Sequence, residues 1–340
     1  MAADARSVDG PGTPVSLLQM MTGYWVSQAI YVAAKLGIAD HIAAGAADSR
    51  DLADATHTDA QSLQRLLRAL VSIGVFSEAT PGEYGLTPVS ALLRTGTPDS
   101  MRALAIMYNE EQYRAWADLL FSVRTGKPAF EHTFGKGIFE YFRENPEPAW
   151  TFGEAMTAWT NQLAGAVVAA FDFSPFSTVV DVGGSHGTLL AAILRKNPAT
   201  RGILFDLPNV IAGAAEHLAA EGVADRCTHI GGDFFEAVPA GGDLYVMAQI
   251  LHDWDDERCV AILRRCRTAL RDGGKLLIVE LVLPPGDGPF FGKWLDLHML
   301  VMASGRERTA AEYQQLLQAA RFELTHVQPT AAGASIVEAV

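Results

Sequence analysis

The sequence predicts a two-part chain, with a helical N-terminal domain followed by an α/β domain that is built on a mainly parallel sheet. Up to about residue 170 the apolar residues recur at helical spacing, whereas after Phe171 short apolar runs alternate with amphipathic stretches. Such alternation is typical of βαβ units. In segment 177–187, STVVDVGGSHG, an apolar run carrying an acid is followed by three glycines. A glycine turn after a buried strand often opens a ligand site in such a sheet.

The composition argues against several classes of protein. The chain has 340 residues, and 39 acidic against 26 basic side chains give a formal net charge of −13 at pH 7. Proteins that bind nucleic acid through phosphate contacts are normally basic. The sequence shows neither a signal-peptide pattern nor an apolar stretch of membrane-spanning length. Its three cysteines lack the spacing of a disulfide framework or of paired metal ligands. We therefore expect a reduced, soluble, cytoplasmic protein.

The N-terminal part begins with residues 1–14, which are small, polar and proline-punctuated, and are expected to form a disordered tail. The following stretch, SLLQMMTGYWVSQAIYVAAKLGIADHIAAG (16–45), is apolar on almost all sides at helical spacing. A helix of this kind must be buried, and this one lies far in sequence from any sheet pattern. Burial between two subunits is the expectation, which predicts a homodimer.

A winged-helix pattern lies within the domain that we expect to span 15–100. Two helical periods meet at a turn near Thr56–Asp59, and a strand-like apolar piece and a Pro-Gly turn follow. Winged helices often bind DNA, but the same shape also serves oligomerisation. The second helix carries only Arg65 and Arg68 as basic residues. In so acidic a chain this favours a dimerisation domain.

The next stretch, 101–170, is helical and rich in aromatic residues and methionine, and we expect it to link the two domains and to contribute to the acceptor pocket. From 171 to 340 the strand-like runs include TVVDV, RGILFD, DLYVMAQ and KLLIVELVL. The tail FELTHVQPTAAGASIVEAV has two strand-like runs joined by small residues. It is expected to add an antiparallel hairpin at the sheet edge.

The glycine turn has the spacing D-x-G-G-x-x-G, with Asp181 before Gly183 and Gly184. Dinucleotide sites use G-x-G-x-x-G and direct backbone N–H groups at a pyrophosphate. A carboxylate in front of the glycines would repel a pyrophosphate but attract a ligand that carries an ammonium and a sulfonium group. S-adenosyl-L-methionine (SAM) fits that description.

Two further acids follow later strands. Asp206, with Leu207 after it, ends RGILFD, where a carboxylate can accept the ribose hydroxyls of an adenosine. Asp233 and Phe234 follow the next strand and offer an acceptor for the adenine amino group and an aromatic face. Each acid could instead be a helix cap or turn residue, but capping does not easily explain acids after three successive strands.

The segments DVGGSHG, FDLPNVI, GGDFFEAVP, LHDWDDE, VELVLPP and GRERT together resemble the class I SAM-dependent small-molecule O-methyltransferases. This family includes plant caffeic acid and isoflavone enzymes and bacterial polyketide and phenazine O-methyltransferases. The resemblance covers nearly the whole chain. It implies a Rossmann-like class I methyltransferase sheet, preceded by an all-helical, winged-helix-like dimerisation domain.

The proton of a phenol must be removed when its oxygen attacks a methyl group, since phenols ionise near pH 10. His252 in LHDWDD is the candidate general base, because it follows a strand end and imidazole suits this role. The resemblance implies that Glu280 and Glu307 are the carboxylates that flank this histidine. Asp255 is expected to cap the helix that follows.

One position departs from the family. The plant enzymes carry a lysine that contacts the cofactor four residues before the histidine, where this chain has Ala248 followed by Gln249. Gln249 is therefore a further candidate for cofactor binding. The oxygen ligands of HDWDD could suit Mg²⁺, but the metal-dependent catechol methyltransferases lack such an N-terminal domain and the histidine–glutamate set. We expect no metal.

The substrate pocket is expected to be aromatic and apolar. Met156 and Met299 match family methionines, and methionine conforms readily to flat rings. Further candidates for the lining, each of which could equally be a packing residue, are Met107, Tyr108, Phe130, Trp294 and Met302.

The predicted function is SAM-dependent O-methylation of a phenolic hydroxyl on a small aromatic, polyketide-like natural product of bacterial specialised metabolism. One alternative is a family member that has drifted to N- or C-methylation, decarboxylation or hydroxylation. Another is a DNA-binding regulator that senses SAM. The sequence does not identify the acceptor or the hydroxyl that is modified.

Overall fold

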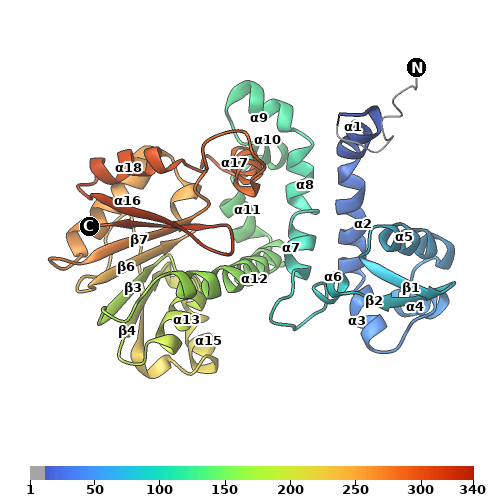
Figure 1. Ribbon diagram of the computed structural model, residues 1–340, viewed down its shortest axis with the longest axis horizontal. Coiled ribbons are helices and arrows are strands. Elements are labelled where there is room, and N and C mark those ends of the chain that lie inside the picture. Colours follow the sequence, from blue (N-terminus) through green and yellow to red (C-terminus); the bar gives the residue numbers. More distant parts are fainter. Residues whose placement is uncertain (1–11) are drawn as a thin grey trace, which may run out of the picture. The chain divides into compact units, whose positions relative to one another are not determined.

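The computed structural model describes residues 12–340. These residues form two compact units (Figure 1). The first comprises the described residues up to Tyr113 together with Glu147–Ala158, and the second comprises Arg114–Pro146 and Trp159–Val340. Among the described residues, none of the helices has the length and apolar character needed to span a membrane.

The first unit consists of helices and one two-stranded hairpin. Its elements are α1 (Pro14–Met21), α2 (Gly23–Lys35), α3 (Ile38–Ala43), α4 (Ser49–Thr56), α5 (Ala60–Ser72), β1 (Phe76–Thr80), β2 (Glu83–Leu86), α6 (Pro88–Ala91) and α7 (Arg102–Met107). The predicted winged-helix order is confirmed, with α4 and α5 followed by the antiparallel pair β1–β2. Because of this hairpin the domain is not all-helical.

Helix α5 shows how the local sequence builds this unit. The side chain of Asp59 caps the helix by accepting a hydrogen bond of 2.8 Å from Ser62 N. Leu63, Leu67 and Leu70 follow at helical spacing and are buried. The expected disordered tail falls mostly on residues 1–11, which lie outside the described residues, and α1 already begins at Pro14.

Helices α1 and α2 leave a row of large apolar side chains in solvent. Trp25 is 61% exposed and Met20 77% exposed. The other exposed members of this row, which we call the α1–α2 apolar row, are Leu17, Leu18, Met21, Tyr24 and Val26. Of the segment 16–45, which was predicted to be buried between subunits, the part up to Val26 is therefore accessible in the single chain, whereas Ala34 and Ile38 are buried in the core of this unit.

The second unit is built on a seven-stranded sheet with the order β5-β4-β3-β6-β7-β9-β8. The strands are β3 (Thr178–Val182), β4 (Arg201–Asp206), β5 (Cys227–Gly231), β6 (Leu244–Ala248), β7 (Lys275–Glu280), β8 (Leu324–Pro329) and β9 (Ser335–Ala339). The first five are parallel, whereas β9 pairs antiparallel with both β7 and β8. The predicted hairpin is present. Its second strand lies inside the sheet, and β8 forms the edge.

The second unit also contains helices on both sides of the sheet (Figure 1). They are α9 (Leu119–Thr125), α10 (Ala129–Phe134), α11 (Ile138–Glu144), α13 (Thr188–Lys196), α14 (Pro208–Ile211), α15 (Ala214–Ala220), α16 (Asp256–Ala269), α17 (Phe291–Met302) and α18 (Ala310–Ala319). Of these, α13 and α15 lie on one side of the sheet and α16 and α18 on the other. Two more helices, α8 (Glu111–Trp116) and α12 (Pro146–Ala170), contain residues of both units. Short 3₁₀ turns lie at Ala224–Arg226 and Leu251–Asp253.

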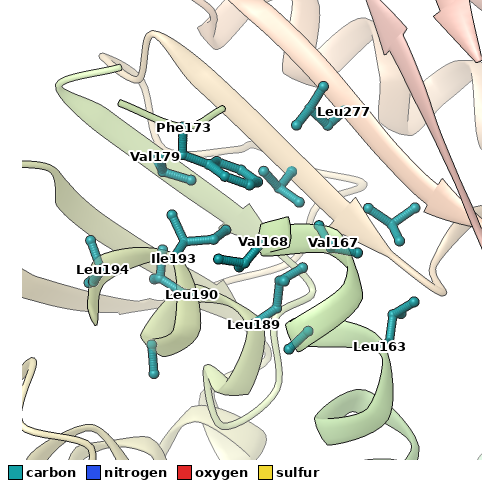
Figure 2. Close-up of a cluster of buried hydrophobic side chains, with 14 of the residues drawn as sticks. Leu163, Val167, Val168, Phe173, Val179, Leu189, Leu190, Ile193, Leu194 and Leu277 are labelled. Atoms are coloured by element: carbon teal, nitrogen blue, oxygen red, sulfur yellow. The ribbon is translucent and has the colours of Figure 1, made fainter. Parts of the chain in front are cut away.

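The side chains of each strand alternate between two cores. Val179 joins a cluster with residues of α12 and α13, whereas its neighbour Val180 joins a cluster with residues of α16 and α18. Figure 2 shows Val179 and Leu277 of the sheet in the first cluster, together with Leu163 of α12 and Ile193 of α13. Both faces of the strands are therefore covered, which explains why they read as continuous apolar runs.

Candidate active site

The glycine turn follows β3, and its glycines are required by packing within the chain. Gly183 has φ +73°, and a Cβ there would lie 2.5 Å from Ile250 Cδ1. A Cβ on Gly184 would lie 2.5 Å from Asp181 Cγ and from Leu204 Cδ1. The turn must therefore lie directly on the carboxylate of Asp181, which is possible only without side chains at these positions.

Asp181 lies within β3 and is only 2% exposed. Its Oδ2 atom accepts no hydrogen bond from any residue between 12 and 340. Burial, reinforced by the nearby Asp206 carboxylate, raises the pKa of Asp181 to about 7. A buried carboxylate oxygen without a partner is costly, and a cationic ligand would relieve that cost.

Asp206 ends β4 and is hydrogen-bonded to the glycine turn. Its carboxylate accepts hydrogen bonds from Ser185 N at 2.8 Å and from Leu207 N at 2.7 Å. Burial raises the pKa of Asp206, although both backbone hydrogen bonds oppose the shift. Leu207 is 45% exposed beside it.

Asp233 lies after β5 and caps its own loop by accepting a hydrogen bond of 2.8 Å from Phe235 N. The next residue, Phe234, lies near the glycine turn, because its Cε1 atom would be 3.8 Å from a Cβ on Gly183. Phe234 also packs edge-on against Trp254, with ring centroids 6.2 Å apart. Asp181, Asp206 and Asp233 therefore lie at the carboxyl ends of three adjacent parallel strands, β3, β4 and β5.

Gln249 follows β6 directly, in the left-handed backbone conformation with φ +57°. This conformation is uncommon for a residue with a Cβ. Its side-chain Nε2 donates to Glu280 Oε2 at 3.3 Å, and its backbone N donates to Val279 O at 3.0 Å. The preceding Ala248, at the position of the plant lysine, is the last residue of β6.

His252 lies on the 3₁₀ turn after β6 and is 8% exposed. Its Nδ1 is 2.8 Å from Glu307 Oε1. A carboxylate can only accept, so Nδ1 carries the proton and Nε2 holds the lone pair of the neutral ring. The sheet edge and the segment before α18 thus bring together two residues that are far apart in sequence.

Glu280 ends β7 and has no solvent exposure. Its Oε1 accepts hydrogen bonds from Ile250 N at 3.0 Å and Leu251 N at 2.9 Å. Its Oε2 is 3.8 Å from His252 Nδ1, beyond hydrogen-bond distance. The ring nitrogen is therefore held by Glu307, while Glu280 holds the backbone that carries the ring.

The carboxylates dominate the electrostatics of the imidazole. Burial on its own lowers the pKa of His252, but Glu280, Asp253 and Glu307 outweigh burial and raise it to about 10. Burial raises the pKa of Glu280 to about 7, although His252 opposes that shift. Raising the pH therefore increases the neutral form of the ring, which is the form that can accept a proton.

The residues predicted for the substrate pocket are divided between the two units. Phe130 and Met302 are buried in one apolar cluster of the second unit, with Ile138 and Val301. Also in the second unit, Met299 is buried, whereas Trp294 is 67% exposed. The remaining three, Met107, Tyr108 and Met156, belong to the first unit.

The predicted site residues did not include Asp253, Arg308 or His298, although the first two lie in the segments LHDWDDE and GRERT. Asp253 Oδ1 is 3.7 Å from His252 Nε2. Arg308 is fully buried and contacts the turn that carries His252. Trp116 Nε1 donates to His298 Nδ1 at 2.8 Å, and burial lowers the pKa of His298 to about 4, so this second histidine stays neutral near pH 7.

His252, Glu280 and Glu307 could also be considered as a metal site, because one potential ligand atom from each lies within 4.8 Å of the others. Glu280 Oε1 already accepts two backbone N–H groups, and Glu307 Oε1 accepts from His252. Glu280 Oε2 accepts from Gln249 Nε2 at 3.3 Å, so of these carboxylate oxygens only Glu307 Oε2 has no hydrogen-bond donor among the described residues. The geometry fits a hydrogen-bonded base better than a cation site.

The comparisons with known proteins identify the family of the chain. Residues 116–323 match the O-methyltransferase domain, and residues 18–96 match the O-methyltransferase dimerisation domain. A phenazine O-methyltransferase of Lysobacter antibioticus is 58% identical over 323 residues, which are 95% of either chain. The 3-amino-4-hydroxybenzoate 4-O-methyltransferase of Streptomyces cremeus is 45% identical over 92% of this chain and 86% of its own.

A crystal structure of an O-methyltransferase from neocarzinostatin biosynthesis, in complex with SAM and 2-hydroxy-5-methyl naphthoic acid, is also similar. It is 32% identical, has a TM-score of 0.78, and the match covers 100% of this chain and 99% of that one. The chain therefore belongs to the class I O-methyltransferase family, and it is an enzyme that uses SAM as its methyl donor.

Proposed function

We propose that this enzyme methylates a phenolic hydroxyl of a small aromatic natural product and works as a homodimer. The observation that carries the proposal is the hydrogen bond of 2.8 Å between His252 Nδ1 and Glu307 Oε1, which leaves Nε2 as the basic nitrogen. Three of the relatives have names that give a phenazine, a hydroxybenzoate or a hydroxynaphthoate as the compound that is methylated on oxygen. Flat hydroxylated aromatic compounds are therefore the acceptors to test first.

The residues present suit the methyl donor. SAM supplies a methyl group that its sulfonium charge has already activated for displacement. The unpartnered, buried Oδ2 of Asp181 would face the cationic part of this cofactor. We assign its binding to the residues around the glycine turn and the neighbouring strand ends, namely Asp181, Gly183, Gly184, Asp206, Leu207, Asp233, Phe234 and Gln249.

His252 removes the proton from the acceptor. As the oxygen attacks, Nε2 takes the phenolic proton and the ring becomes an imidazolium. Glu307 keeps the proton on Nδ1, and the nearby charge of Glu280 stabilises the imidazolium. The same carboxylates that raise the resting pKa of the ring therefore favour its protonated product.

The proposal also assigns residues to the substrate pocket and to the dimer contact. Within the second unit, the lining is assigned to Phe130, Trp294, Met299 and Met302. Apolar and sulfur-containing side chains suit a flat aromatic ring. The dimer contact is assigned to the α1–α2 apolar row, because these large apolar side chains are exposed in the single chain and exposed apolar patches are typical of interfaces.

The test uses methyl-labelled SAM and a panel of phenols that includes 1-hydroxyphenazine and hydroxynaphthoic acids. We expect label on the acceptor oxygen, and at least about a 100-fold loss of kcat in His252→Ala. Calorimetry should show that this variant binds SAM as the wild type does. If His252→Ala retained full kcat with the best acceptor, the assignment of the base would be wrong.

A further inference from the structure

The turn Leu251–Trp254, which carries His252 and which we call the catalytic turn, is poorly supported by its own hydrogen bonds. Asp253 N donates to Ile250 O at 3.3 Å, and Trp254 N donates to Leu251 O at 3.2 Å. Both distances are at the long end for N–H···O bonds, and one 3₁₀ turn is not a stable element on its own. The position of the imidazole must therefore be set by other parts of the chain.

The N–H groups at the start of this turn are held by Glu280, as described above. Its carbonyl groups are held by Arg308. The guanidinium Nη1 donates to Leu251 O at 2.9 Å, and Nη2 donates to Trp254 O at 2.7 Å. These two carbonyls lie on either side of His252 and Asp253, so the side chain of Arg308 is hydrogen-bonded to both ends of the catalytic turn.

The guanidinium uses its full set of donors in this position. Besides the two carbonyls, Nε and Nη2 donate to Asp256 Oδ1 at 3.1 and 2.8 Å, and Nη1 donates to Arg306 O at 3.3 Å. Arginine has five N–H groups in a fixed plane, whereas lysine has three around one atom. Lysine therefore cannot reproduce this pattern.

Arg308 also follows Glu307 directly in the chain. Glu307 holds the ring of His252 by its Nδ1, while Arg308 holds the backbone on both sides of that ring. Asp296 Oδ1 accepts from Glu307 N at 2.9 Å, which anchors the pair on α17. Two adjacent residues thus fix both the backbone and the ring of the base.

We propose that Arg308 is a positioning residue for methyl transfer, which sets the place of His252 by clamping the carbonyls of Leu251 and Trp254. The proposal rests on the proposed function, since it assigns His252 as the base. A displacement of about 1 Å in a catalytic group can cost on the order of 100-fold in rate. Arg308 should therefore affect kcat far more than binding.

The test compares Arg308→Lys and Arg308→Ala with Arg306→Lys as the matched control. Arg306 also pairs with Asp256, at 2.7 Å, but its side chain is 43% exposed, and the partners of its guanidinium are Asp256 and Glu312 rather than the catalytic turn. With 1-hydroxyphenazine, Arg308→Lys should lose about 10- to 100-fold in kcat, while KM and the Kd for SAM stay within about threefold. Arg306→Lys should keep the wild-type kcat, and guanidinium chloride should partly restore Arg308→Ala.

A second readout does not need an acceptor. In proton NMR, His252 Nδ1–H bonded to Glu307 should give a low-field resonance that disappears in His252→Asn. This resonance should broaden or vanish in Arg308→Lys and persist in Arg306→Lys. A sharp, unshifted resonance in a folded Arg308→Lys or Arg308→Ala protein, or a kcat equal to that of the control, would overturn the proposal. Failure of the wild type to methylate any phenol would instead count against the proposed function.

Discussion

The proposed chemical centre of this enzyme is a single imidazole, that of His252, which is surrounded by carboxylates. Glu307 bonds to its Nδ1, and Asp253 lies 3.7 Å from its Nε2. These acids raise the pKa of His252 to about 10 although burial alone would lower it. The same carboxylates therefore have two opposite effects. They make the imidazole a stronger base, and they reduce the fraction of the imidazole that is neutral and able to accept a proton.

Asp253→Asn tests this balance. Removing a carboxylate that raises the pKa of His252 should lower that pKa, so a larger fraction of the ring is neutral at a given pH. In the wild type kcat/KM should rise from pH 7 towards pH 10, and in Asp253→Asn the rising limb should move to lower pH. The profile is measured with one acceptor throughout, so ionisation of the phenol is common to both proteins.

Asp287→Asn is the control for this comparison, because Asp287 lies on an exposed loop. It removes the same formal charge but should leave the profile unmoved. If the rise of kcat/KM with pH occurred at the same pH in Asp253→Asn as in the wild type, the pH dependence would arise from the acceptor and not from His252.

The catalytic turn contacts the segment before α18. Gly305 lies against that turn without a side chain. A Cβ there would overlap the backbone oxygen of His252 and would lie 2.7 Å from the carbonyl carbon of Asp253. The two segments approach backbone to backbone, which lets Glu307 and Arg308 reach the turn.

Gly305→Ala should therefore displace the catalytic turn. Overpacking of this kind typically costs about 1–3 kcal/mol, and we expect a lower Tm together with a loss of kcat that exceeds the change in SAM affinity. Gly288→Ala is the matched control, since a Cβ at Gly288 meets nothing within 4 Å. Thermal unfolding and steady-state kinetics measure both effects. Equal Tm and kcat in the two variants would contradict this account of the contact.

Several elements could be predicted from sequence because their signals are local. The Pro-Gly turn marked the β1–β2 hairpin, and Asp255 was correctly predicted to cap α16, since its side chain accepts from Arg258 N. The role of Arg308 could not be predicted in this way. Its partners are carbonyl groups more than fifty residues away, and backbone oxygens exist at every position, so they leave no pattern in the sequence.

The strand order of the sheet and the lining of the pocket could be predicted only in part. The tail was recognisable as a hairpin, but alternation alone does not say which of its strands joins β7, and the structure gives that place to β9. The aromatic and methionine residues chosen for the pocket include Phe130 and Met302, which pack in an apolar cluster. Helical spacing looks the same for core and pocket side chains, so the sequence could not separate these roles.

Formation of the homodimer is predicted to depend on the α1–α2 apolar row. Trp25→Glu would place a charge at a position where 61% of an apolar side chain is exposed in the single chain. If that surface is covered by a second subunit, burial of the charge opposes association, and light scattering should find a monomer. Val123→Glu on α9, where Val123 is 64% exposed, should leave a dimer. A dimeric Trp25→Glu protein would place the interface elsewhere.

The position of β9 bears on how the protein is made. This strand pairs on one side with β7, where Ser335 lies opposite Glu280, and on the other side with β8. During translation, β7 and β8 both emerge before the strand that joins them. The edge that presents Glu280 can therefore be completed only after residue 339 has left the ribosome, so a nascent chain should acquire catalytic competence late and in one step.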